Sequence, residues 1–184
     1  MNTQAIGILF LKDLFLSRKP LFAYFVGGIC SSGLACVPNE TVAFTGSILS
    51  ITVAIGAGMH LIGGLLLGET IEQTRIFVMS LPISLMEYSI AKIAVVLTTY
   101  LIPWSAMLAC SMILHYILPE SKQGTVAIIP VIFLYLLGAF TIQLVTAVLT
   151  ESIGWTIFMV VCCNVLLNVF LKKLYSFSAI IEAA

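Results

Sequence analysis

Uninterrupted apolar runs, each about 20 residues long, constrain this chain more than any other feature of its sequence. A helix of about 20 residues crosses the hydrocarbon core of a bilayer, and continuous runs favour helices over the alternating strands of a β-barrel. Hydrophobic residues make up 61% of the 184 positions and charged residues only 9%, against roughly 25% charged residues in a soluble domain. We therefore expect an all-α integral membrane protein, a helical bundle of five to six transmembrane helices in a single domain over residues 1–184.

The order of the apolar runs predicts a short interfacial helix followed by five spans. The interfacial helix covers residues 3–18, where Lys12 and Asp13 interrupt a segment that is too short to cross comfortably. The five spans are expected at about residues 21–37, 43–67, 89–118, 125–149 and 153–171.

One long polar interruption, Gly68–Lys92, separates the second and third spans. It carries five of the 16 acidic and basic residues (eight of each) in the chain: Glu69, Glu72, Arg75, Glu87 and Lys92. Placing these groups in hydrocarbon would cost on the order of 10–15 kcal/mol, so the segment is expected at a membrane face.

Basic residues near the ends of the spans predict the orientation of the chain. They gather in the N-terminal segment and in the polar interruption: Lys12, Arg18, Lys19, Arg75 and Lys92. The N-terminus and residues 68–92 are therefore expected in the cytoplasm, in a multi-pass protein of the bacterial cytoplasmic membrane. Five crossings then place Lys172 and Lys173 outside, against the same rule. The fifth apolar segment is re-entrant, or the rule is overridden, or a sixth crossing is missing, and the sequence leaves these alternatives open.

Residues 69–81 have the pattern of an amphipathic helix. Ile71, Phe77 and Leu81 share one side, whereas Glu72 and Arg75 share the other. Two capping-box spacings frame the region. They are Thr70 with Gln73 at the start of this helix and Ser84 with Glu87 just before the third span. Pro82 separates the short helix from the span.

Within Gln73–Lys92, the core Ser80-Leu81-Pro82-Ile83-Ser84 is followed by Glu87-Tyr88 and Ala91-Lys92. This stretch resembles the coupling region of type-2 ATP-binding-cassette exporter permeases. In that family an acidic residue opens the coupling helix, and a leucine-proline-(isoleucine or valine)-serine step leads to an aromatic residue and a lysine. Leu11-Lys12-Asp13-Leu14 likewise resembles the interfacial connecting helix of the family, which usually has six spans where this sequence predicts five.

The resemblance implies a permease that pairs with a second permease, of the same or another kind, and with a separate ATP-binding-cassette ATPase. The coupling helix would dock on that ATPase through residues spread over and just beyond it: Glu69, Glu72, Arg75, Phe77, Leu81, Pro82 and Ser84. The sequence agrees on one point, because it contains neither G-x-x-x-x-G-K-[ST] nor any Gly-Lys dipeptide. ATP and magnesium are therefore expected in the partner, and this chain is not expected to be an enzyme or to bind a cofactor.

Polar residues within the apolar runs are candidates for a substrate path. His60 lies inside the second span, where an ionisable residue is a functional candidate, although a hydrogen-bonded neutral histidine is the commoner outcome. Asn164 and Asn168 share a face of the fifth span, where hydrogen bonds between helices or a polar lining would explain them. Gly64-x-x-x-Gly68 has the spacing that lets helices approach closely, within the chain or at a subunit interface. No catalytic or metal-binding constellation emerges from the sequence, and no basic run indicates nucleic-acid binding.

Two other classes of function remain open at this level. A small membrane scaffold or immunity-type protein without an ATPase would keep its function when residues 70–81 are replaced by a polar linker. A proton-coupled carrier centred on His60 would lose its activity in a His60→Ala variant.

Overall fold

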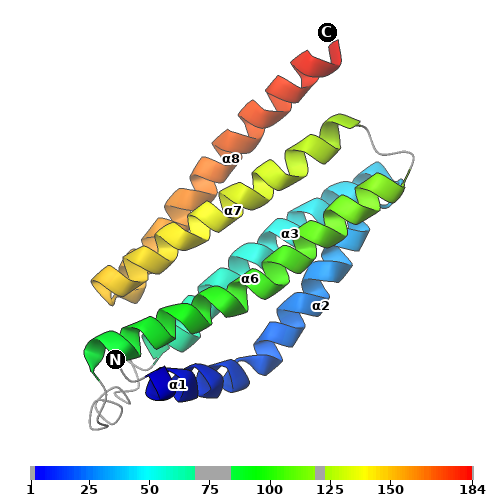
Figure 1. The fold of residues 1–184 in the computed structure, drawn as a ribbon. Coiled ribbons are helices and arrows are strands. Elements are labelled where there is room, and N and C mark those ends of the chain that lie inside the picture. Colours follow the sequence, from blue (N-terminus) through cyan, green and yellow to red (C-terminus); the bar gives the residue numbers. More distant parts are fainter. Residues whose placement is uncertain (1–2, 69–83, 119–122, 184) are drawn as a thin grey trace.

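A computed structural model describes residues 3–68, 84–118 and 123–183, and within these ranges every regular element is helical (Figure 1). The described residues form six α-helices and one π-helical turn, η1, which continues α3. Their bounds are α1 (Thr3–Leu16), α2 (Arg18–Leu34), α3 (Glu40–Leu61), η1 (Ile62–Leu67), α6 (Leu85–Ile117), α7 (Gln123–Thr150) and α8 (Ile153–Ala183).

Among the described residues, four helical stretches are long and apolar enough to cross a membrane. They are Glu40–Leu67, Met86–Ile117, Ile128–Thr150 and Ile153–Leu174. The expectation of an all-α, membrane-embedded protein is therefore confirmed at this level. The first expected span, residues 21–37, corresponds largely to α2, whose 17 residues extend about 26 Å against a hydrocarbon core of about 30 Å.

The long helices run back and forth between two ends of the molecule (Figure 1). One of them, the α1 end, contains α1, the end of η1, the start of α6 and the turn between α7 and α8. The opposite end holds the turn between α2 and α3, and α8 finishes on that side. Because α8 is one continuous helix of 31 residues, the chain does not turn back within it.

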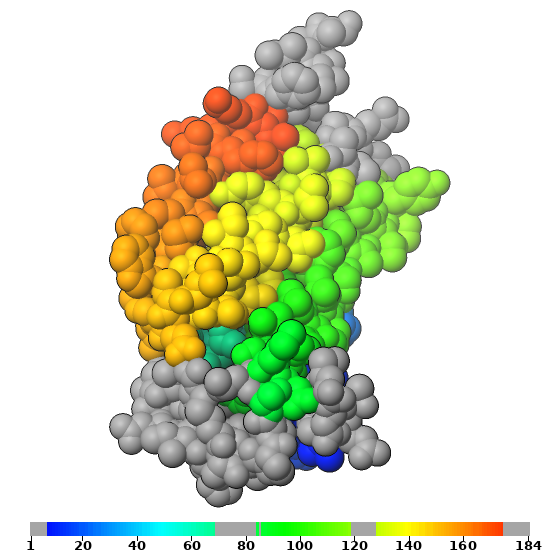
Figure 2. Space-filling view, turned by 60° about the vertical axis from the view of Figure 1, so that its left-hand side comes forward, coloured from blue at the N-terminus to red at the C-terminus, as the bar shows by residue number. Residues whose placement is uncertain are grey.

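The helices pack as two groups. In the first, α2 packs against both α3 and α6; in the second, α8 packs mainly against α7. Figure 2 shows α7 and α8 side by side on one face, with α6 next to them. Buried aromatic contacts join the groups: the rings of Tyr100 and Phe140 stack with centroids 3.7 Å apart, and the Trp104 indole N–H donates to the Phe133 carbonyl oxygen at 3.0 Å. Aromatic side chains bury large apolar areas, so these contacts hold the two groups together.

Small residues allow the first group to pack closely. A Cβ atom on Gly46 would lie 2.3 Å from the backbone nitrogen of Ala35, so only glycine permits this approach of α3 to the end of α2. The Ser50 hydroxyl donates to the Ser31 hydroxyl at 3.1 Å within the same buried contact. By contrast, a Cβ on Gly64 would meet nothing within 4 Å. The small-residue spacing at Gly64 and Gly68 therefore makes no close helix contact among the described residues.

At the opposite end, the turn between α2 and α3 is held at two points. The Asn39 side chain accepts hydrogen bonds from the backbone N–H groups of Thr41 and Val42, and so caps the start of α3. Cys36 Sγ lies 3.2 Å from Nδ1 of His115, near the end of α6. All five cysteines are free thiols in the structure.

Candidate functional site

A buried ion pair joins α1 to α6 at the α1 end. Lys92 Nζ lies 2.6 Å from Asp13 Oδ2, and the two side chains are only 4% and 3% exposed. Lys12 lies farther from the same carboxylate, with its Nζ 3.9 Å from Asp13 Oδ1, and its side chain is 56% exposed. Lys92 is therefore the principal charge partner of Asp13.

The helical periodicity of both elements explains why these two residues meet. On α6, Ala91, Lys92, Val95 and Val96 are all buried, so Lys92 lies on the inward face of the helix. Asp13 on α1 and Ser17 just beyond its end are both buried, and Asp13 lies on the side of α1 that packs against α6. Each charge points into the contact between the helices rather than toward the surroundings.

A buried ion pair of this kind fixes the relative position of two elements. Removing two charges from water is expensive, and their attraction offsets this only when the geometry is good. The short distance supplies that geometry. The Tyr88 ring adds a cation–π contact, with its centroid 5.7 Å from Lys92 Nζ. The pair therefore ties α1 to the first turns of α6 and makes any displacement that separates them costly.

A capping box starts α6 beside this pair, as the sequence predicted. The Ser84 hydroxyl accepts from the Glu87 backbone N–H at 3.3 Å, and Glu87 Oε2 accepts from the Ser84 backbone N–H at 3.1 Å. Both helix-start donors are thereby satisfied at the point where the polar interruption passes into the third span. Ser84 is thus the N-cap residue of α6, at the boundary between the expected coupling segment and this helix.

Replacing Ser84 with alanine should destabilise the start of α6 by about 1 kcal/mol, because the backbone N–H of Glu87 loses its acceptor. Hydrogen exchange at the first amides of α6 measures this as faster local opening. Ser105→Ala is the matched control, since that exposed hydroxyl bonds only to the Ile102 carbonyl of its own helix. Equal exchange in the two variants would show that the box contributes nothing.

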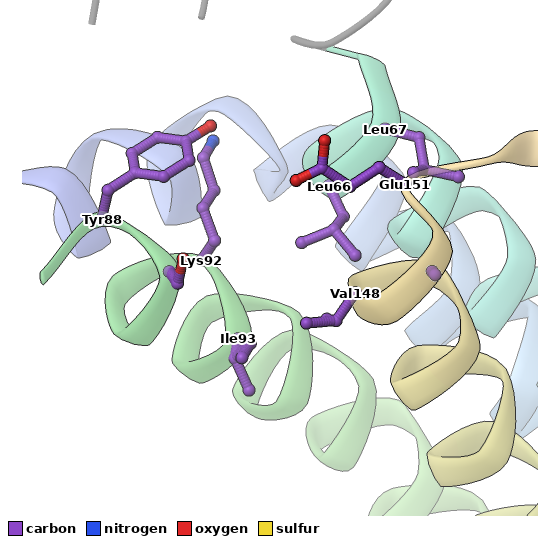
Figure 3. Close-up of a pocket in the computed structure, with 9 residues that line it drawn as sticks. Leu66, Leu67, Tyr88, Lys92, Ile93, Val148 and Glu151 are labelled. Carbon is purple, nitrogen blue, oxygen red and sulfur yellow. The ribbon is translucent and has the colours of Figure 1, made fainter. Parts of the chain in front are cut away.

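A small pocket of about 60 Å³ opens next to the ion pair, between η1, α6 and the end of α7. Figure 3 shows Lys92 and Tyr88 side by side on α6, with Leu66 and Glu151 across the pocket. Its lining residues are Leu66, Leu67, Tyr88, Ser89, Lys92, Ile93, Ala147, Val148 and Glu151. Glu151 has φ 47°, a left-handed conformation that non-glycine residues adopt mainly in tight turns, here between α7 and α8.

Most of the expected docking residues lie outside the described residues. These are Glu69, Glu72, Arg75, Phe77, Leu81 and Pro82, and their docking role stays a prediction. The two flanks of their segment are described, and both belong to the α1 end. Leu67, at the close of η1, and Tyr88, in the first turn of α6, line the same pocket.

The structure does not bring the substrate-path candidates together. His60 is exposed on α3, and its ring lies 5.8 Å from the Tyr24 ring of α2. The Asn164 amide donates to the Val160 carbonyl and the Asn168 amide to the Asn164 carbonyl, both within α8. The hydrogen bonds that these amides donate are therefore intrahelical, whereas bonds between helices had been one explanation from the sequence.

Sequence reasoning missed the pairing of Asp13 with Lys92. It placed Lys92 in a polar segment at the membrane face and Asp13 in an interfacial helix, and it did not expect either side chain to be buried. The available signal was the isolation of one carboxylate in an otherwise apolar segment, since a buried charge requires a partner. Among the described residues, no group of three or more His, Cys, Asp or Glu side chains is arranged to hold a metal ion.

The fold and this site define an all-helical, membrane-embedded protein with a charged, capped junction at one end. No family model matches the chain, and neither a curated protein nor a solved structure matches it. Its function is therefore argued from its own residues.

Proposed function

We propose that this chain is the transmembrane permease subunit of an ATP-binding-cassette exporter. It moves a substrate across the membrane with ATP hydrolysed by a separate subunit, and it pairs with a second permease. The observation that carries the proposal is that the two described flanks of residues 69–83, the close of η1 and the start of α6, line the same pocket at the α1 end. This charged, amphipathic segment links two long apolar helices whose ends meet at the α1 end, beside the buried Asp13–Lys92 pair.

The contacts around this junction would transmit a displacement of residues 69–83 to the neighbouring helices. A partner that moves residues 69–83 acts on α3 through η1 and on α6 through its capped first turn. The Asp13–Lys92 pair makes α1 follow α6, and the stacked Tyr100 and Phe140 rings extend the contact to α7. Interfaces of this kind shift as packed units, so a local displacement becomes a movement of whole helices.

The orientation of the chain is part of the proposal. Lys12, Arg18 and Lys19 all belong to α1 or the start of α2, which supports a cytoplasmic α1 end in a bacterial cytoplasmic membrane. Lys172 and Lys173 belong to the second half of α8, the helix that finishes toward the opposite end of the molecule, against the rule. The larger basic group near the N-terminus dominates, since the first segments of a chain usually set its topology.

Affinity purification from native membranes in mild detergent, followed by mass spectrometry, tests the proposal. We expect a stoichiometric partner that carries a P-loop, and a loss of roughly 30-fold in its affinity in a Phe77→Asp variant, as for a central aromatic residue of an interface. Phe177→Asp is the matched control, because it makes the same change in the last part of α8. A clean preparation without any ATPase would favour the scaffold or immunity-type alternative.

A further inference from the structure

We propose that the outward side of α1, with the start of α2, is a binding surface for anionic phospholipid headgroups. This inference does not depend on the proposed ATPase partner, since it concerns only the leaflet at the α1 end.

The side of α1 that faces away from the bundle is apolar. Ile8, Leu11, Phe15 and Leu16 are each between 63% and 70% exposed. Ile8, Leu11 and Phe15 follow one another at three- and four-residue steps, which places them along one helix face. Asp13 is buried on the other side. In Figure 1, α1 bends away from the direction of the long helices, as a helix lying along the membrane surface would.

Cations accompany this apolar side. Lys12 is on its edge, and Arg18 and Lys19 follow at the start of α2; all three are exposed. The Arg18 guanidinium lies 3.9 Å from the centroid of the Phe15 ring, so an apolar and a cationic group are presented together. The single carboxylate of α1, on Asp13, is turned inward onto Lys92, and Lys12 lies 3.9 Å from its other oxygen while its own side chain is 56% exposed.

An anionic lipid interface fits this combination better than the other candidate occupants. Exposed apolar side chains insert at the boundary between acyl chains and headgroups, while long basic side chains reach up to the phosphates. A second copy docking through the same face would bring two sets of these three cations together, and like charges oppose that contact. Each cation near an anionic surface strengthens membrane binding by about fivefold, and three together by about a hundredfold.

The test compares lipid retention by the whole chain. The protein is equilibrated in detergent with equal amounts of phosphatidylglycerol and phosphatidylcholine, and bound lipid is counted by native mass spectrometry. We expect a preference for phosphatidylglycerol that falls at least about tenfold in a K12Q/R18Q/K19Q variant and weakens at 0.5 M salt. The K172Q/K173Q variant is the matched control, because it removes two exposed lysines from the opposite end. No preference in the native chain, or an unchanged preference in the triple variant, would overturn the proposal.

A photo-crosslinking amino acid at Leu11 then identifies what lies against the face. Leu11 is 64% exposed, so the substitution does not disturb the packing of α1 on α6. We expect the label on phospholipid when the chain is irradiated in membranes. A cross-link to a second copy, or to another protein in place of lipid, would contradict the inference. This outcome is independent of whether an ATPase co-purifies.

Discussion

Replacing Lys92 with methionine should destabilise the protein by about 3–5 kcal/mol, the usual cost of leaving a buried charge without its partner. The Asp13 carboxylate would remain 3% exposed and lose the ammonium group 2.6 Å away. Lys12 is a weaker partner that does not replace it, since its Nζ lies 3.9 Å from the carboxylate and its side chain is 56% exposed. Unfolding in mixed micelles with increasing fractions of a denaturing detergent measures the loss.

The double variant Asp13→Leu/Lys92→Met separates two contributions to the free energy of unfolding: the penalty for a buried charge without a partner, and the net stabilisation by the ion pair. Replacing both partners with apolar residues of similar size is often neutral, so most of the lost stability should return. Lys172→Met, at an exposed position on α8, is the control and should stay within about 0.5 kcal/mol of the native chain. A Lys92→Met variant as stable as this control would show that the pair is not buried as described.

The second large effect is expected at Gly46, where valine should destabilise the protein by about 3 kcal/mol or more. Any Cβ there would lie 2.3 Å from the Ala35 nitrogen and 2.5 Å from the Leu34 carbonyl carbon. Both are backbone atoms, so no rotamer change relieves the overlap and α2 must move away from α3. The Ser50–Ser31 hydrogen bond at the same contact would weaken with it.

Gly56→Ala on the same helix is the matched control for Gly46. A Cβ at Gly56 meets nothing within 4 Å, so alanine should be neutral or stabilise α3 by up to about 1 kcal/mol through its helix propensity. Thermal unfolding of Gly46→Val, Gly46→Ala and Gly56→Ala in the same detergent gives the comparison. If Gly46→Ala and Gly56→Ala unfold at the same temperature, the close approach of α2 and α3 is absent.

Local features of the fold could be predicted because they depend on neighbouring residues. The apolar runs identified the long helices, and the spacing of Ser84 and Glu87 identified the capping box that starts α6. The π-helical turn at Ile62–Leu67 was not predicted. Its apolar sequence, with Gly63 and Gly64, is equally compatible with an ordinary α-helix. A change of helical pitch depends on how η1 packs against α6 and α7, which is information that one segment does not contain.

The candidate site was predictable only in part, for the same reason. The charges of residues 68–92 led us to expect a junction at a membrane face, and residues on both sides of the undescribed part of that segment line one pocket. The ion pair joins residues 79 positions apart, and no local pattern specifies that Asp13 turns toward α6. The exposure of His60 could not be predicted, because helix position alone does not show which side faces the bundle.

ATP hydrolysis by the assembled complex in nanodiscs is the most direct measurement of the central claim. The native chain, co-purified with the P-loop partner that we propose, should give ATPase activity that depends on the permease. Phe77→Asp should reduce that activity by about tenfold or more, whereas Phe177→Asp should leave it unchanged. ATPase activity that is the same in all three preparations, or no ATPase in the native one, would contradict the assignment of this chain as an ATP-driven permease.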